Sequence, residues 1–176
     1  MWFGASVLAL ALAAFGARPA WALAGCDAFT AALRASASDL GVEFSRAVVV
    51  SRTRSDANEF DITTKVNVDA TLSCRSDQIL RFEARISEPA NAHTTTSFGR
   101  FQTAALKAAL GWDGSKSHGV LSGMTGEARE FLAASRQRGD VYIAGKTEEH
   151  EPGGVSIGLM ATDSDRTFII VGPAAQ

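Results

Sequence analysis

Polar and apolar residues alternate along residues 60–74 more regularly than anywhere else in the chain. Every intervening residue is polar, and Thr64 alone interrupts an apolar row of Phe60, Ile62, Val66, Val68, Ala70, Leu72 and Cys74. Alternation with a period of two predicts a strand that has one covered face and one wet face. A strand of this length exceeds the usual size, so we expect it to bend, coil around a helix or carry a bulge, with Thr64 as the candidate break.

The same reasoning predicts five further strands. A β-branched run favours a strand over 42–53, and clean alternation favours one over 80–86. Three short strands, separated by turn residues, are expected over 141–147, 155–162 and 167–172.

Apolar stripes at helical spacing predict helices over 27–40, 98–110 and 126–138. The segment 112–119 is expected to be the most exposed loop. Each helix is followed by a glycine suited to a left-handed backbone, namely Gly41, Gly111 and Gly139. The expected N-caps are Asp27, either Thr96 or Ser97, and Thr125.

The elements therefore follow the order α-βββ-αα-βββ. Separate groups of strands and helices predict an α+β fold, with an antiparallel curved sheet and helices packed on one face. The length of 176 residues favours one domain. We expect that domain to span residues 25–176, and 46% hydrophobic with 20% charged residues is typical of a globular chain.

The first 24 residues resemble the export signals of bacterial Sec substrates. An uncharged apolar run ends at Arg18, and residues 22–24 read Ala-Leu-Ala, with small residues where a signal peptidase requires them. We expect cleavage before Gly25 and a mature protein in a Gram-negative periplasm or outside the cell. A retained anchor is the alternative, because no Lys or Arg precedes the run, although the run is short for one.

Residues 23–26, Leu-Ala-Gly-Cys, also resemble the lipobox of bacterial lipoproteins. The alternative is therefore a membrane-anchored lipoprotein acylated at Cys26. Acylation would leave Cys74 as an odd thiol in an oxidising compartment, which is uncommon. We favour a Cys26–Cys74 disulfide that pins the first helix to the sheet and stabilises the fold by about 4 kcal/mol in the chain-entropy model.

The charge balance and the hydrophobic runs indicate which partners the chain can have. The formal net charge is −2, and without a basic surplus we expect no nucleic-acid partner. Beyond the N-terminus no segment has the roughly 18 apolar residues of a membrane span, so none is expected in the mature chain.

Metal-ligating residues gather at 148–151, which read Glu-Glu-His-Glu. Carboxylates and imidazole suit a divalent cation, but consecutive strand residues point in opposite directions. A site would need His93 or His118 from elsewhere, and we favour a solvated hairpin tip. Residues 163–165, Asp-Ser-Asp, lack the glycine and later glutamate of a calcium loop. We expect no metal and no cofactor.

Nucleophilic chemistry has one weak candidate, the adjacent Ser117 and His118. Sequence neighbours rarely reach each other as nucleophile and base, and the chain has no Gly-x-Ser-x-Gly elbow. We therefore assign no catalytic residue.

The leading functional hypothesis is a non-catalytic binding module for a small-molecule ligand or a protein partner. The concave face of a bent sheet under an alanine-rich helix is a natural pocket, and the candidate binding residues are Trp112 and His118. The alternative is a hydrolase-type enzyme that uses His118 or His93 with a carboxylate.

Overall fold

A computed structural model describes residues 25–45, 49–54, 57–140 and 144–173; the expected export signal, 1–24, lies outside them. Within these residues the elements follow in chain order as α1 (Cys26–Asp39), β1 (Val49–Arg54), β2 (Ala57–Thr63), β3 (Asp69–Arg75), β4 (Gln78–Ser87), α2 (Ala92–Leu110), α3 (Gly114–Arg138), β5 (Ala144–Glu151), β6 (Val155–Thr162) and β7 (Asp165–Val171).

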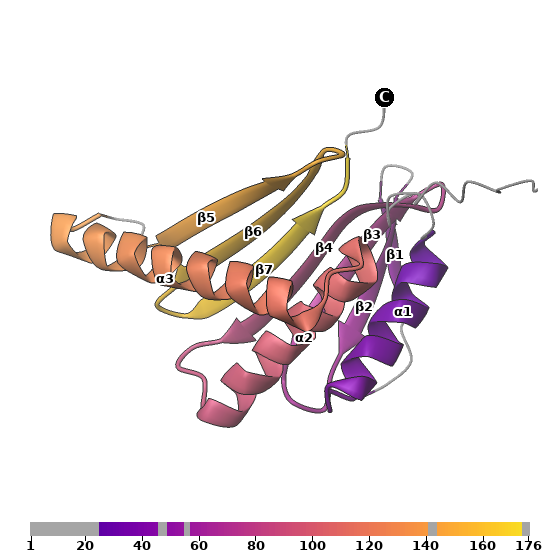
Figure 1. Cartoon of the computed structure of the whole chain (residues 1–176), viewed down its shortest axis with the longest axis horizontal. Helices are drawn as coiled ribbons and strands as arrows, with labels where there is room; N and C mark the ends of the chain where they lie inside the picture. Colours follow the sequence, from indigo (N-terminus) through magenta and orange to yellow (C-terminus); the bar gives the residue numbers. More distant parts are fainter. Residues whose placement is uncertain (1–24, 46–48, 55–56, 141–143, 174–176) are drawn as a thin grey trace, which may run out of the picture.

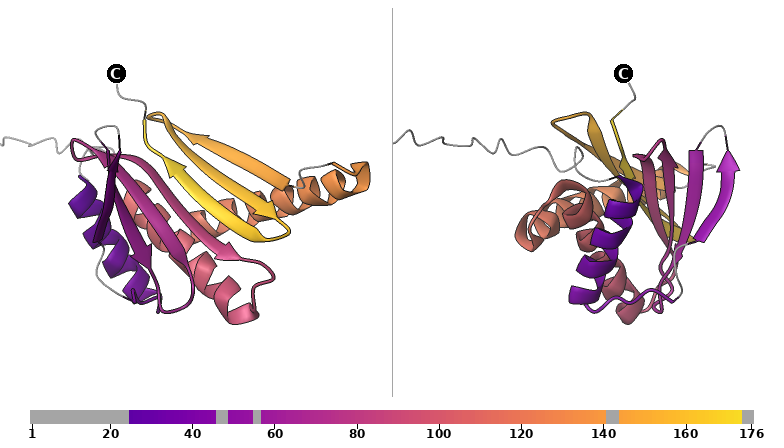
Figure 2. Two further views of the ribbon diagram at one scale, coloured as in Figure 1. Left: turned by 180° about the vertical axis from the view of Figure 1, so that it is seen from behind. Right: turned by 90° about the vertical axis from the view of Figure 1, so that its right-hand side faces the viewer.

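The described strands form one open antiparallel sheet in the order β1-β2-β3-β4-β7-β6-β5. The three helices of the described residues lie on one face of this sheet, and the sheet twists so that β5–β7 run at an angle to β1–β3 (Figures 1 and 2). The predicted α+β class, with helices on one side of an antiparallel sheet, is confirmed. Only the number of strands between α1 and α2 differs, because the structure has four where three were predicted.

The extra strand arises because residues 60–74 are not one strand. The chain reverses after Thr64, whose side-chain oxygen accepts hydrogen bonds from the backbone N–H groups of Val66 and Val68 at 3.3 and 3.1 Å. Asn67 takes a left-handed backbone with φ of 57°, as its short polar side chain permits. In the hairpin Phe60 pairs with Leu72, so the apolar row stays on one face although the chain has turned.

The two central helices begin earlier than predicted. The side chain of Asn91 accepts from the Thr94 N–H at 2.8 Å and starts α2. Asp113 accepts from the Lys116 N–H at 2.7 Å and starts α3, so most of the expected loop 112–119 is helical. Capping by a side chain one residue before the helix supplies an acceptor for a backbone N–H that would otherwise lack one. Thr125, the expected cap, lies inside α3.

Aromatic side chains fill the space between α1, α2 and the sheet. Phe82 on β4 is fully buried and contacts Phe29 of α1 and Phe101 of α2, with ring centroids 5.4 and 6.0 Å apart. Such edge-on and tilted pairs contribute beyond the area that they bury. These contacts fix α1 and α2 over β2–β4.

Small residues instead bring α3 close to β5. A side chain at Gly145 would overlap the carbonyl oxygen of Ala128 and lie 2.8 Å from the backbone nitrogen of Leu132. Only glycine permits this approach of helix backbone to strand backbone. The neighbouring Thr147 hydroxyl donates to Glu127 at 2.9 Å and fixes the same contact.

Candidate functional site

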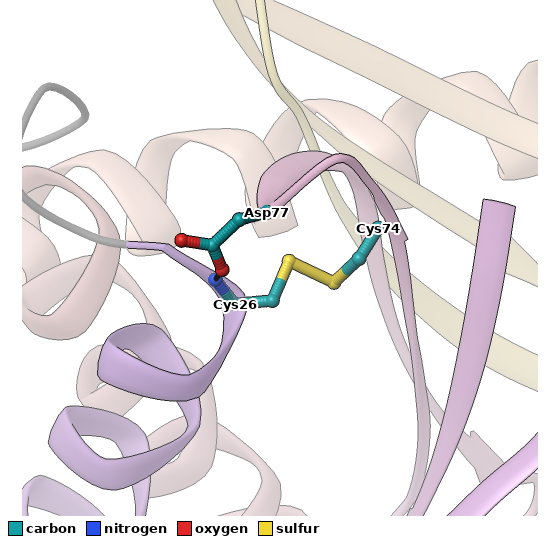
Figure 3. The surroundings of a disulfide bond; sticks show 3 residues. All are labelled: Cys26, Cys74 and Asp77. Atoms are coloured by element: carbon teal, nitrogen blue, oxygen red, sulfur yellow. Dashed lines mark hydrogen bonds between the residues drawn. A yellow bond between two sulfur atoms is a disulfide. The ribbon is translucent and has the colours of Figure 1, made fainter.

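The disulfide ties the start of α1 to the end of β3 (Figure 3). Cys26 and Cys74 are bonded, with Cα atoms 6.3 Å apart, and both are buried. Asp77, in the β3–β4 turn, accepts from the Cys26 backbone N–H at 2.8 Å and so supports the first turn of α1. The predicted cysteine pair is thus joined, and the helix is attached to the sheet twice within a few residues.

A groove of about 620 Å³ lies between α2 and α3, which diverge from the turn that joins them (Figure 1). One stripe of each helix lines it. The α2 stripe contains Thr95, Gly99, Gln102 and Thr103. The α3 stripe contains His118, Ser122, Thr125, Gly126 and Arg129. Phe98, Leu121 and Leu159 add apolar surface, and this volume is in the range of small-molecule sites.

Gln102 is the unusual residue of the groove. Gln102 is only 5% exposed, and its amide nitrogen Nε2 is buried without a hydrogen-bond partner among the described residues. A buried donor without a partner costs about 1–3 kcal/mol. Most buried polar groups in proteins are paired, so an unpaired donor on a residue of the groove wall calls for an explanation.

The groove is cationic. Arg100, Arg129 and Arg166 line it together with His118, and no aspartate or glutamate of the described residues is part of the lining. Arg166 is compensated, because its guanidinium pairs with Glu88 and also donates to Thr95 at 3.0 Å. Arg100 and Arg129 have no carboxylate partner among the described residues, so two positive charges remain available.

The structure separates the two candidate binding residues. His118 lines the groove from the second turn of α3. Trp112 lies in the turn between α2 and α3, is 7% exposed and is not part of the groove lining. The Lys116 ammonium sits 3.9 Å from its ring centroid, a cation–π contact that covers the indole.

The candidate nucleophile and base do not meet. Ser117 is fully buried, its hydroxyl has no hydrogen-bond partner among the described residues, and His118 beside it is exposed. Successive helical residues point about 100° apart, which keeps the two side chains on different faces. His93, in the first turn of α2, is exposed and does not line the groove.

The acidic segments are also accounted for by local structure. Residues 148–151 continue β5 and pair with β6, so they are not the hairpin tip that we expected; the tip lies at 152–154. Asp163 pairs with Arg136 of α3. In the part of the chain that is described, no three His, Cys, Asp or Glu side chains gather as a metal site would require.

Sequence reasoning missed the main groove residues, Gln102, Arg100 and Arg129. A signal was present, because Thr95, Gly99 and Gln102 recur at helical spacing, and His118, Ser122 and Arg129 do so on the next helix. Such a polar stripe reads as an ordinary solvated helix face until the partner helix is known.

Comparison with protein-family models, curated proteins and solved structures gave no match. No helix among the described residues is both long enough and apolar enough to cross a membrane.

Proposed function

We propose that the protein is an exported binding module whose ligand site is the groove between α2 and α3. The observation that carries this proposal is the groove itself, about 620 Å³ in volume, where the apolar surface of Phe98, Leu121 and Leu159 lies beside polar side chains of α2 and α3. The Gln102 amide nitrogen is buried without a partner among the described residues, so a ligand acceptor would have to draw this side chain toward the groove. The hydrogen bond formed there would remove the desolvation cost that the unbound fold carries.

The groove suits a ligand better than a reaction. A hydrolase that used His118 would need a carboxylate or comparable group to orient the imidazole. Within the part of the chain that the structure describes, no carboxylate lines the groove and His118 forms no hydrogen bond with another side chain. Binding requires only shape, apolar surface and a few convergent polar groups, and the groove supplies these.

Filling the groove tests the site directly. A Cβ at Gly126 meets nothing within 4 Å, and Gly126 lines the groove. The Gly126→Phe variant should therefore fold and occupy the cavity. Gly123→Phe is the matched control, since Gly123 lies on the same helix, is equally open and is outside the lining.

The measurement is a two-dimensional amide NMR screen of a small-molecule library against residues 25–176. Ligands should shift amides of the α2 and α3 stripes in the parent and in Gly123→Phe, and should fail to do so in Gly126→Phe. A screen without groove shifts, or shifts that persist in Gly126→Phe, would contradict the proposal.

Export and the oxidised state belong to the same proposal. The N-terminal segment has the pattern of a cleaved signal, and the Cys26 sulfur is bonded to Cys74, which leaves no thiol for acylation. An intact mass of the protein from its native compartment should correspond to a start at Gly25 and rise by about two daltons on reduction. A start at Cys26 with added lipid would establish the membrane-anchored alternative.

A further inference from the structure

We infer that the groove between α2 and α3 takes an amphipathic organic anion, a molecule with one carboxylate or phosphate head and an apolar body. This inference rests on the proposed function, because it names the ligand class of that same groove. It uses one feature that the binding proposal does not need, namely the sign of the charge in the groove lining.

The charge of the groove favours an anionic head. Arg100 and Arg129 line the groove without a carboxylate partner among the described residues, while Glu88 already compensates Arg166. The whole chain is slightly acidic, with a net charge of −2, so a wall with cations and no acid departs from its average. Guanidinium groups match the planar oxygens of carboxylates and phosphates and donate several hydrogen bonds at once.

The hydrogen-bond inventory points the same way. The Gln102 Nε2 group is a donor that has no acceptor among the described residues. The hydroxyls of Thr103 and Thr125 already donate, to Gly99 O at 3.0 Å and Leu121 O at 2.7 Å within their own helices. The donors left for a ligand include the guanidinium groups of Arg100 and Arg129 and the hydroxyls of Thr96 and Ser122. An anionic head is rich in acceptors and suits this set of donors.

The rest of the lining favours an apolar body. Phe98, Leu121 and Leu159 lie in the same groove, so a fully hydrated inorganic ion would leave much of the apolar surface of the groove without a contact. Burial of an alkyl chain contributes about 0.8 kcal/mol per CH₂ group. A chain of eight carbons is a suitable probe for a groove of about 620 Å³.

The experiment compares octanoate, octyl phosphate, octanol and octylamine by calorimetry and amide NMR on residues 25–176. Octanoate or octyl phosphate should bind at least tenfold more tightly than octanol, which is about 1.4 kcal/mol. Octylamine should bind most weakly, and the affinity of the anions should fall with added salt. The stronger of the two anions identifies the head group.

Matched variants locate the charge. Arg100→Gln should weaken octanoate binding roughly threefold, the size expected of an exposed ion pair. Lys107→Gln is the control, because Lys107 carries the same charge on the same helix outside the groove lining. The double variant Arg100→Gln with Arg129→Gln should weaken binding about tenfold.

Gln102→Leu separates a binding role from a structural one. Because the side chain replaces a buried unpaired donor, the free variant should unfold at the same temperature as the parent or a higher one. Octanoate should nevertheless bind it at least about tenfold more weakly, since a hydrogen bond to a charged group is lost.

The outcomes are distinguishable. Groove shifts that are equal for octanol and octanoate, or larger with octylamine, would overturn the anionic ligand and leave the groove as a binding site. Absence of groove shifts with all four probes would overturn the ligand class, and the library screen then decides whether the groove binds any small molecule.

Discussion

The two halves of the sheet are covered by helices in opposite ways. Over β2–β4, α1 and α2 pack through large aromatic side chains such as Phe29, Phe82 and Phe101. Over β5 and β6, α3 lies so close at Gly145 that a single methyl group would overlap its backbone. The first half depends on side chains that fill the space between helices and sheet. The second half depends on the absence of a side chain at Gly145.

The groove lies where these two kinds of packing meet. Helix α2 is positioned by the aromatic cluster and α3 by contact with β5, so the helices diverge instead of packing along their full length (Figure 1). Leu159 of β6 and Arg166 of β7 then reach the space between them. The difference between the halves thus makes the cavity, and the two halves should respond differently to a change in side-chain volume.

Phe82→Ala should give the largest effect, a loss of about 4 kcal/mol in the free energy of unfolding, since it removes the ring that α1 and α2 share. Chemical denaturation measures this loss. Phe131→Ala is the control, because Phe131 is 53% exposed on α3, and its loss should be within about 0.5 kcal/mol. Equal losses in the two variants would disprove the aromatic basis of the first half.

Gly145→Ala should destabilise the second half by roughly 3 kcal/mol, because the added Cβ meets backbone that cannot rotate away. The matched control is Gly158→Ala on the adjacent strand, where the added carbon would lie 3.7 Å from Ile169 in ordinary contact. Gly158→Ala should stay within about 1 kcal/mol of the parent in the same denaturation experiment. A tolerated Gly145→Ala would mean that α3 is free to move off β5.

Helix capping should affect both halves alike. Asn91 caps α2 and Asp113 caps α3 through one side-chain hydrogen bond each. Replacement of either residue by alanine should cost about 1 kcal/mol in thermal or chemical unfolding. A loss much larger for Asp113→Ala than for Asn91→Ala would show that α3 owes its position to its cap more than to Gly145.

The smallest effect concerns an exposed ion pair beside the β2–β3 turn. A hydrogen bond from Lys65, 2.6 Å long, together with its charge, lowers the pKa of Glu43 below the ordinary value of 4.5. A carboxyl with a lowered pKa stabilises the fold above its unfolded pKa, and this contribution is lost as pH falls through the folded value. Lys65→Met should return the Glu43 pKa toward 4.5, as an NMR titration of the side chain would show; an unchanged pKa would mean that the pair does not form.

Local patterns in the sequence were sufficient to predict most of the helices and strands. Helical spacing with a following glycine predicted the first helix as 27–40, and α1 runs Cys26–Asp39. Alternation predicted 155–162, the bounds of β6. The parity of two cysteines predicted the pair that the structure joins. Each of these signals depends on residues near each other in the chain or on a simple count.

Patterns of the same kind gave wrong predictions where two different local structures produce the same pattern. A hairpin whose turn keeps the alternation in phase has the same row of apolar residues as one long strand, and 60–74 is such a hairpin. A helix that begins with glycine and serine has the composition of a loop, and α3 begins at Gly114 in this way. Side-chain acceptors at Thr64 and Asp113 decided both cases.

The sequence by itself determined the α+β class, the side of β3, β4 and β6 that faces the core, and the cysteine pair. Periodicity reflects burial, and an even number of cysteines favours pairing. The candidate site was decided only by the tertiary structure. Gln102 and Arg129 lie on different helices, and Leu159 comes from a strand far along the chain. Their meeting depends on how far α2 and α3 diverge, which the aromatic cluster and Gly145 set, and no pattern within a single element records that distance.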